Sequence, residues 1–360
     1  MINSVYIHIP FCKNICSYCD FPKVFCNDYW INKYLEMLKK EITLKYKNDL
    51  IKTIYIGGGT PSSLNIKQLK KLFDIIKLFN LDDDVEITFE CNLDSLTIEK
   101  LNLLKENHIN RLSIGIETFD KKALKFLNRD ISNISLIKKA KKLGFKNINI
   151  DLIYALPNEN IKDLKKDLDM FLSLDIEHIS LYSLILEKNT KLFNKNVLPI
   201  DQELDLKMYE LICKVLKKNG YNHYEISNFS KTGYESRHNL AYWDNKEYYG
   251  FGMGASGYIG NIRYTNTKSI TNYLNGKLEF ERELVTDKQL MEYEMILGLR
   301  KLKGVCISNF EKKYQKKIED VFSIKKLIEE GKLIIEDDYI KIPEKYLYIS
   351  NSILINFIGD

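Results

Sequence analysis

The chain has 360 residues, of which 45% are hydrophobic and 29% are charged, and its formal net charge is only +5. This length suits roughly two domains, and the composition excludes a disordered, collagen-like or low-complexity protein. A charge excess this small, spread along the whole chain, gives no indication of nucleic-acid binding.

The first half of the chain alternates apolar strand patterns with amphipathic helix patterns. Strands are predicted at residues 4–9, 53–56, 85–90, 111–115, 148–153 and 178–183. Asp28 is the predicted cap of the first helix, and Ser132 and Gly144 are predicted to bound the helix before the fifth strand. Six β-then-α units require a parallel sheet with right-handed crossovers. Because the repeat ends near residue 185 instead of continuing to eight units, we expect a partial (β/α)6 barrel of the TIM type.

The second half of the chain has a different pattern. Residues 201–219 predict a long helix closed by Gly220, and residues 223–264 predict irregular structure with short strands. Capping-box spacings begin at Thr286 and Ser308, and a hairpin is predicted around Asp337 and Asp338. The fold class is therefore α/β, with a barrel core at 1–185, an extension at 186–280 and a smaller C-terminal α+β domain at 281–360. This last part is helical and winged-helix-like, but it lacks the basic recognition helix typical of DNA binding.

Seven cysteines are present, and three of them, Cys12, Cys16 and Cys19, form a C-x3-C-x2-C motif directly after the first strand. That position is the carboxyl end of the barrel strands, where barrel chemistry is found. Thiolates bind zinc, copper(I) or iron–sulfur clusters. A structural zinc site needs a fourth ligand nearby, whereas three thiolates on a four-iron cubane leave one iron open. The remaining cysteines are predicted to be buried as small hydrophobic residues.

The compartment is predicted from two absences. No apolar run reaches the ~18 residues of a membrane span, and residues 1–4 lack the basic and long apolar regions of a signal peptide. We therefore expect a cytoplasmic protein that is not an integral membrane protein. Clustered cysteines in that compartment are more typical of metal binding or chemistry than of disulfides.

The cysteine motif and its neighbours resemble the radical S-adenosylmethionine (SAM) superfamily. The residues that carry this resemblance are Tyr6-x-His8-Ile9-Pro10-Phe11-Cys12, then Cys16, then Tyr18-Cys19-Asp20-Phe21. Within the superfamily, the whole chain resembles the oxygen-independent coproporphyrinogen III oxidases and the HemW-type heme chaperones. The resemblance implies a [4Fe-4S] cluster on Cys12, Cys16 and Cys19. It also implies that SAM bound at the open iron is cleaved to a 5′-deoxyadenosyl radical.

Further residues match SAM-binding positions of that family. Gly57-Gly58-Gly59-Thr60-Pro61 follows the second strand, where a glycine triplet is usually only a turn but allows close backbone approach to a ligand. The resemblance implies SAM contacts from Tyr6, Tyr18, Gly58, Gly59, Thr60 and Glu90. Asp151, a charge inside an apolar strand, is costly unless it is paired or faces a polar site, and we assign it to SAM as well.

Glu117 and Arg129 match positions that help to hold a second SAM molecule in the oxidases. That branch usually has glutamine where this chain has Glu117, and a carboxylate has no N–H to donate. The substitution leaves two alternatives, a second SAM site or an ordinary ion pair.

Three departures separate the chain from the oxidases. The oxidases have a fourth cysteine where this chain has Phe21, and they have tens of residues before the cluster motif, whereas here the first cysteine is Cys12. Residues 238–243 read H-N-x-x-Y-W, similar to the heme-binding signature of the HemW group. A lone histidine is more often structural, but in this motif His238 becomes the candidate axial ligand of heme. Residues 248–255 resemble the segment that lines the cofactor cleft in both groups.

The resulting hypothesis is a heme chaperone that binds a [4Fe-4S] cluster, SAM and heme. Its partners would be heme as cargo and acceptor hemoproteins, with membrane-bound ones among the candidates, and no nucleic acid. The main alternative is coproporphyrinogen III oxidation to protoporphyrinogen IX, an activity that we expect this chain to lack. A radical SAM enzyme acting on RNA is the remaining alternative, but it predicts an RNA-binding module and a basic face that the sequence does not show.

Overall fold

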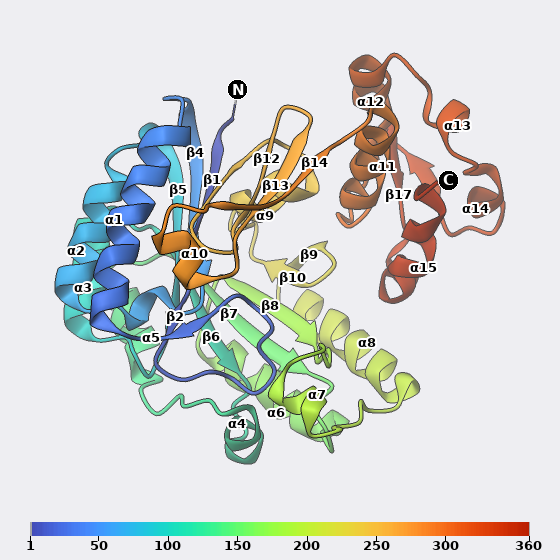
Figure 1. The fold of residues 1–360 in the computed structure, drawn as a ribbon. Coiled ribbons are helices and arrows are strands. Elements are labelled where there is room, and N and C mark those ends of the chain that lie inside the picture. The colour runs from blue at the N-terminus through green and yellow to red at the C-terminus, as the bar shows by residue number, and fades with distance from the viewer. Residues whose placement is uncertain (1, 360) are drawn as a thin grey trace.

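The centre of the computed structural model, which describes residues 2–359, is one nine-stranded sheet (Figure 1). Its middle consists of six parallel strands: β1 (Ser4–Ile9), β4 (Leu50–Gly58), β5 (Asn80–Asn92), β6 (Arg111–Glu117), β7 (Asn147–Tyr154) and β8 (His178–Ser183). These six strands lie side by side in chain order. The predicted α/β fold with a six-unit partial barrel is therefore confirmed, since no pairing between described residues joins the two outer strands.

Later segments extend the sheet at both edges. β11 (Tyr249–Phe251) pairs in parallel with β1, and the antiparallel strands β10 (Asn228–Ser230) and β9 (Asn222–Glu225) follow β8. A separate three-stranded sheet contains β12 (Ser256–Ile259), β13 (Ile262–Asn266) and β14 (Glu279–Leu284), and the helices α9 (Arg237–Trp243) and α10 (Ile270–Leu274) belong to the same part of the chain. The region predicted as irregular thus contains short strands, as expected, and also the unpredicted helix α9.

Helices connect the parallel strands and lie outside the sheet (Figure 1). They are α1 (Asp28–Lys45), α2 (Ile66–Ile76), α3 (Ile98–Glu106), α4 (Lys121–Leu127), α5 (Ser135–Lys142) and α6 (Ile161–Ser173), with the 3-10 turn η1 at Pro61–Ser63. Two further helices, α7 (Lys191–Asn194) and α8 (Gln202–Lys218), follow β8 and lead to β9. In α1, Ile31, Leu35, Leu38 and Ile42 recur at helical spacing and are buried. Each such side chain contributes roughly 2 kcal/mol by burial, which holds α1 against the sheet.

Two predicted caps are wrong. Asn27 caps α1 instead of Asp28, because the Asn27 side chain accepts the backbone N–H of Trp30. Ser132 does not cap α5, because that helix begins only at Ser135, with Ile134 at its N-cap position, and the Ser132 hydroxyl donates to Asp130. Both errors lie within a few residues of the helix, where competing Asn, Asp and Ser side chains offer equivalent oxygen acceptors.

Residues 287–357 form a second group of helices with a small sheet, at the upper right of Figure 1. Its elements are α11 (Asp287–Gly298), β15 (Val305–Cys306), α12 (Ile307–Tyr314), α13 (Ile318–Val321), α14 (Lys325–Glu329), β16 (Ile334–Glu336), β17 (Tyr339–Lys341), η2 (Glu344–Ile349), α15 (Ser350–Leu354) and η3 (Ile355–Phe357). Its buried apolar residues cluster separately from those of the barrel. The capping box at Thr286 and the hairpin turn at Asp337 and Asp338 are confirmed. The predicted cap Ser308 is wrong, since its hydroxyl donates to Asp338.

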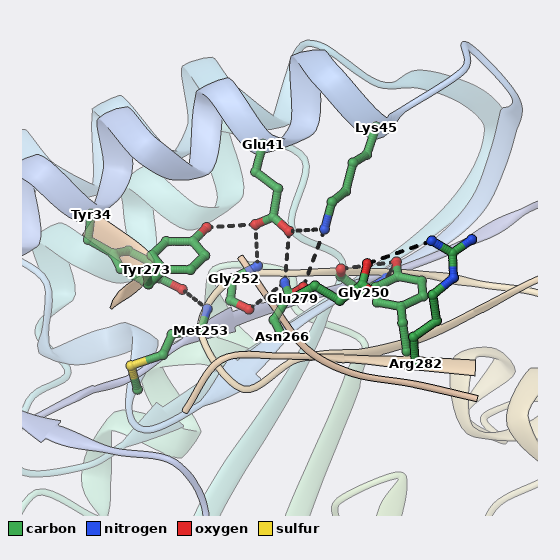
Figure 2. A network of polar contacts seen from close by, with 11 residues as sticks. Tyr34, Glu41, Lys45, Gly250, Gly252, Met253, Asn266, Tyr273, Glu279 and Arg282 are labelled. Atoms are coloured by element: carbon green, nitrogen blue, oxygen red, sulfur yellow. Dashed lines mark hydrogen bonds and ion pairs between the residues drawn. The ribbon is translucent and has the colours of Figure 1, made fainter. Parts of the chain in front are cut away.

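A buried carboxylate joins α1 to the segment that follows β11 (Figure 2). Glu41 is 0% exposed, and its Oε1 accepts from Lys45 Nζ at 2.9 Å and from Asn266 Nδ2 at 2.7 Å. Its Oε2 accepts from the backbone N–H of Gly252 at 2.9 Å and from the Tyr273 hydroxyl at 2.7 Å. A charge removed from water is tolerated when it is paired and hydrogen-bonded in this way. These bonds therefore fix the later segment to the first helix.

Tyr34, also on α1, continues this connection to β1. Its hydroxyl donates to the carbonyl oxygen of His8 at 2.6 Å and accepts the backbone N–H of Met253 at 2.9 Å. Gly254 has a φ of +76°, and a Cβ there would lie 2.5 Å from the ring of Pro22. The segment after β11 therefore packs directly against β1 and against the loop that contains the cysteine motif. Among residues 2–359, no helix combines the length and the apolar character that a membrane crossing requires.

Candidate functional site

A cavity of about 420 Å³ lies at the carboxyl ends of the parallel strands. Eleven of the thirteen predicted site residues line it: Cys12, Cys16, Tyr18, Cys19, Gly58, Gly59, Thr60, Glu90, Glu117, Arg129 and Asp151. These residues come from strands and loops that are far apart in the sequence. The carboxyl ends of parallel strands meet at one edge of the sheet, which explains why the fold brings them together. Tyr6 and His238 are the two predicted residues that do not line the cavity.

The loop with the cysteine motif is held by a hydrogen-bonded chain that starts on β1. His8 Nε2 lies 2.8 Å from the carbonyl oxygen of Pro22, and because a carbonyl only accepts, this nitrogen donates. His8 Nδ1 therefore accepts from the Tyr6 hydroxyl at 2.9 Å. Burial lowers the pKa of His8 to about 4, so the imidazole is neutral at physiological pH. Tyr6 thus lies beneath the site and orients the residue that holds the loop.

Each of the three motif cysteines has a neighbouring hydrogen-bond donor. Thr60 Oγ1 donates to Cys12 Sγ at 3.5 Å, and Arg129 Nη1 donates to Cys16 Sγ at 3.6 Å. Lys23 Nζ donates to the carbonyl oxygen of Cys19 at 2.6 Å. Burial raises the pKa of Cys12 to about 12, so thiolate ligation there depends on a metal.

The arrangement of these thiols distinguishes between kinds of metal centre. No three His, Cys, Asp or Glu side chains among residues 2–359 surround a point where a single ion could be held. A tetrahedral zinc needs such convergence, whereas a cubane cluster binds each thiolate at a different iron. Three thiols that line one cavity are the donor set of a cubane with one open iron, whereas a structural zinc would need a fourth ligand beside them.

The glycine triplet is required by close packing within the chain itself. A Cβ at Gly57 would lie 2.7 Å from the carboxyl carbon of Glu90, and a Cβ at Gly58 would lie 2.5 Å from the ring of His8. Gly58 also has a φ of +115°, which a side chain would strain. Its backbone N–H donates to Glu90 Oε2 at 2.9 Å. The backbone of Gly58 and Gly59 consequently forms part of the cavity wall beside a carboxylate.

Two partly buried carboxylates face the cavity. Burial raises the pKa of Glu90 to about 7, although donors that include Tyr55 oppose the shift. Asp151 accepts from Ser113 Oγ at 3.1 Å and from Asn149 Nδ2 at 2.9 Å, and burial raises its pKa as well. A cationic group in the cavity would favour the ionised form of both carboxylates. The wall therefore suits a ligand that carries positive charge.

Glu117 and Arg129 form an ion pair in the structure. Arg129 Nη2 lies 2.7 Å from Glu117 Oε1, and both side chains are only 8% exposed. The same nitrogen donates to the carbonyl oxygen of Gly115 at 2.7 Å and to Asn92 Oδ1 at 3.1 Å. Of the two alternatives left open by the sequence, the ion pair is therefore the one that forms in this conformation.

His238 does not line the cavity and is buried against Tyr55, a residue of the cavity wall whose ring centroid lies 5.4 Å from that of His238. Its proposed role as heme ligand does not fit this geometry. It is 1% exposed, its Nδ1 lies 2.9 Å from Thr53 Oγ1 on β4, and its Nε2 lies 2.8 Å from the Tyr242 hydroxyl. Its backbone N–H is bound by Glu86 on β5. An axial ligand needs a free ring nitrogen and access for the iron. Helix α9 instead uses this histidine to pack against β4 and β5.

The segment predicted to line the cleft, residues 248–255, also lies elsewhere. None of its residues is among those that line the cavity. Its contacts with Tyr34 and Pro22 place it behind β1, where it supports the cysteine loop from outside. Its effect on the site is therefore indirect.

Several residues of the cavity wall were missed by sequence reasoning. Tyr55, Asn92, Ser113, Tyr182, Lys23, Phe21 and Ile185 all line the cavity. Asn92 and Ser113 could have been found, because they are polar residues at or near the carboxyl ends of predicted strands. Phe21 and Ile185 are 61% and 67% exposed, which makes the cavity mouth partly apolar. Their exposure depends on the tertiary fold and has no local signal.

Comparisons with known proteins agree with this geometry. The sequence model of the radical SAM superfamily matches residues 6–171, and the model of the HemN C-terminal domain matches residues 285–345. The heme chaperone HemW of Lactococcus lactis is 40% identical over 99% of this chain and 98% of its own length. The heme chaperone HemW of Bacillus subtilis is 39% identical over the full length of both chains.

A solved structure has the same fold. Coproporphyrinogen III oxidase HemN from Escherichia coli superposes with a TM-score of 0.88, over 99% of this chain and 90% of that chain, at 21% identity. This likeness concerns the barrel and the C-terminal part together, because it covers nearly the whole of this chain.

Proposed function

Because this chain belongs to the HemW family of the radical SAM superfamily, we propose that it is a heme chaperone that binds a [4Fe-4S] cluster, SAM and heme. Its function would be to transfer heme to acceptor hemoproteins. The observation that carries the proposal is the cavity, which combines three cysteine thiols with partly buried carboxylates and has an apolar mouth. The thiols suit a cluster and the carboxylates suit the cationic methionyl end of SAM.

The roles of the chain's residues follow from their positions. Cys12, Cys16 and Cys19 would each hold one iron of the cluster. SAM would lie against Tyr18, Gly58, Gly59, Thr60, Glu90 and Asp151, with Tyr6 beneath it. When bound, the cluster and SAM together supply one-electron chemistry at the sulfonium. The protein's part is to orient the two groups, with Glu90 and the glycine backbone presenting acceptors and donors to the methionyl group.

We place the heme at the mouth of the cavity. Phe21 and Ile185 are exposed there, and a flat apolar macrocycle would cover them. Lys23 Nζ uses two of its three N–H groups on the carbonyl oxygens of Cys19 and Phe21, so one remains for a heme propionate. Heme at this open position would stay accessible to an acceptor protein, as delivery requires.

Anaerobic reconstitution tests the proposal. The reconstituted chain should bind hemin in an absorbance titration and should not convert coproporphyrinogen III. Stoichiometric formation of protoporphyrinogen IX by the same sample would overturn the assignment in favour of the oxidase. Failure to bind hemin would overturn it as well.

Hemin titration of single variants distinguishes the two candidate heme positions. Phe21→Ser should weaken hemin binding about tenfold or more, because it removes roughly 1.5–3 kcal/mol of apolar burial. Phe25→Ser is the matched control, since Phe25 is equally exposed but does not line the cavity. Equal affinities for the two variants would contradict a heme site at the mouth.

His238→Ala completes this series, because it should change the stability of the chain without changing hemin binding. It should leave hemin affinity and the Soret position unchanged. It should lower the free energy of unfolding by about 2–4 kcal/mol, because the hydroxyls of Thr53 and Tyr242 lose their buried partner. A lost or shifted Soret band in a folded variant would restore His238 as the ligand.

A further inference from the structure

We propose that Arg129 sets the reduction potential of the bound cluster through its hydrogen bond to Cys16, and that Glu117 opposes it as the counter-charge. This inference rests on the proposed function, because it requires a cluster on the three cysteines. It assigns the buried ion pair to the cluster and not to a second SAM molecule.

The geometry holds the guanidinium against the sulfur. Arg129 Nη1 donates to Cys16 Sγ at 3.6 Å, while Nη2 is fixed by Glu117 at 2.7 Å and by the carbonyl oxygen of Gly115 at 2.7 Å. A Cβ at Gly115 would lie 2.4 Å from Nη2, so only glycine leaves room for the guanidinium. Because the group is planar, fixing one nitrogen fixes the direction of the other. The bonds to both nitrogens leave only Nε of this side chain without a partner.

The backbone around Cys16 is attached to the same helix that leads to Arg129. The N–H of Ser17 donates to the carbonyl oxygen of Leu127 at 3.0 Å, and Asn128 Nδ2 donates to the carbonyl oxygen of Ile15 at 3.0 Å. The residues on both sides of Cys16 are therefore bound to the end of α4. The contact between sulfur and guanidinium is thus part of a continuous junction and does not depend on one long side chain alone.

The charges of Arg129 and Glu117 should have opposite effects on the reduction potential of the cluster. A cationic donor to a ligand sulfur stabilises the reduced cluster, which carries one more negative charge, and so raises the potential. A carboxylate at the far side of that donor lowers the potential. Both effects are strong because the pair is buried, where charges interact through a low dielectric. Cys12 Sγ, in contrast, accepts from the neutral Thr60 hydroxyl.

Potentiometric titration followed by electron paramagnetic resonance tests the inference on the reconstituted full chain. With dithionite as the one-electron reductant, Arg129→Gln should lower the midpoint potential and Glu117→Gln should raise it. We expect a change of about tenfold in the reduced-to-oxidised ratio at fixed potential, which is 59 mV for a one-electron couple. Lys125→Gln is the matched control, because Lys125 is an exposed cation on α4, the helix that precedes Arg129, and its loss should leave the potential unchanged.

Opposite shifts of the two variants would support the inference, whereas shifts of the same sign, or none, would overturn it. If Arg129→Gln fails to hold a cluster, Glu117→Gln decides alone: a raised potential supports the inference and any other result contradicts it. Iron and sulfide analysis distinguishes a failure of the proposed function from a failure of the role assigned to Arg129. A parent chain without a cluster contradicts the proposed function, while a full cluster with unmoved potentials contradicts only the role of Arg129.

Discussion

Replacing Cys19 with alanine should abolish cluster binding while leaving the barrel folded. The cavity offers three motif thiols, and a cubane held by only two of them would not persist through reconstitution and desalting. Cys19 lies in a loop and is not part of the barrel's apolar core, so its loss should not unfold the chain. The iron and sulfide contents should fall from about four of each per chain to near zero.

Cys26→Ala is the control for this prediction. Cys26 is close to the motif, since its N–H donates to the carbonyl oxygen of Cys12 at 3.0 Å, but it does not line the cavity. This variant should retain a full cluster. If it lost iron as completely as Cys19→Ala, the assignment of three ligands would be wrong and Cys26 would be a fourth. Before reconstitution, when neither variant holds a cluster, the two variants should have the same circular dichroism spectrum and the same thermal unfolding midpoint.

Replacing Glu41 with leucine should lower the free energy of unfolding by about 3–5 kcal/mol. The substitution leaves the Lys45 ammonium, the Asn266 amide, the Gly252 N–H and the Tyr273 hydroxyl without their shared acceptor (Figure 2). Breaking one side of a buried, hydrogen-bonded charge pair has a cost of this size. Urea unfolding of the chain without cofactors measures it.

Glu36→Leu is the matched control, because Glu36 is exposed on the same helix. Its effect should stay within about 0.5 kcal/mol, as for most surface substitutions. Coinciding urea midpoints for the two leucine variants would show that the Glu41 network does not hold the segment after β11 in place.

The barrel core was predictable because its strands are apolar on both faces and follow one another along the chain. The limits of β8 at His178 and Ser183 match the prediction. β11 was not predictable, since Tyr249–Phe251 is too short to show a period and its partner β1 lies 244 residues earlier in the chain. Pairing over such a distance has no local signal.

The site residues at the ends of strands were predictable. The prediction failed for a residue whose role depends on the orientation of its side chain. Eleven predicted residues converge because they follow parallel strands. His238 failed because its partner Thr53 is 185 residues away, and residue type alone cannot show that both ring nitrogens are used. The glycine triplet was interpreted as a ligand contact. Within the chain, side chains at Gly57 and Gly58 would also collide with Glu90 and His8.

The bond between Tyr34 and Met253 has a consequence for the timing of maturation. Its two residues are 219 positions apart, and it supports the strand that leads into the cysteine loop. At roughly 5–20 residues per second, that support is synthesised on the order of ten seconds or more after the cysteines. The loop therefore reaches its final form only late in translation. A premature stop before Met253 would leave every predicted cluster ligand in the product but remove the packing that positions them.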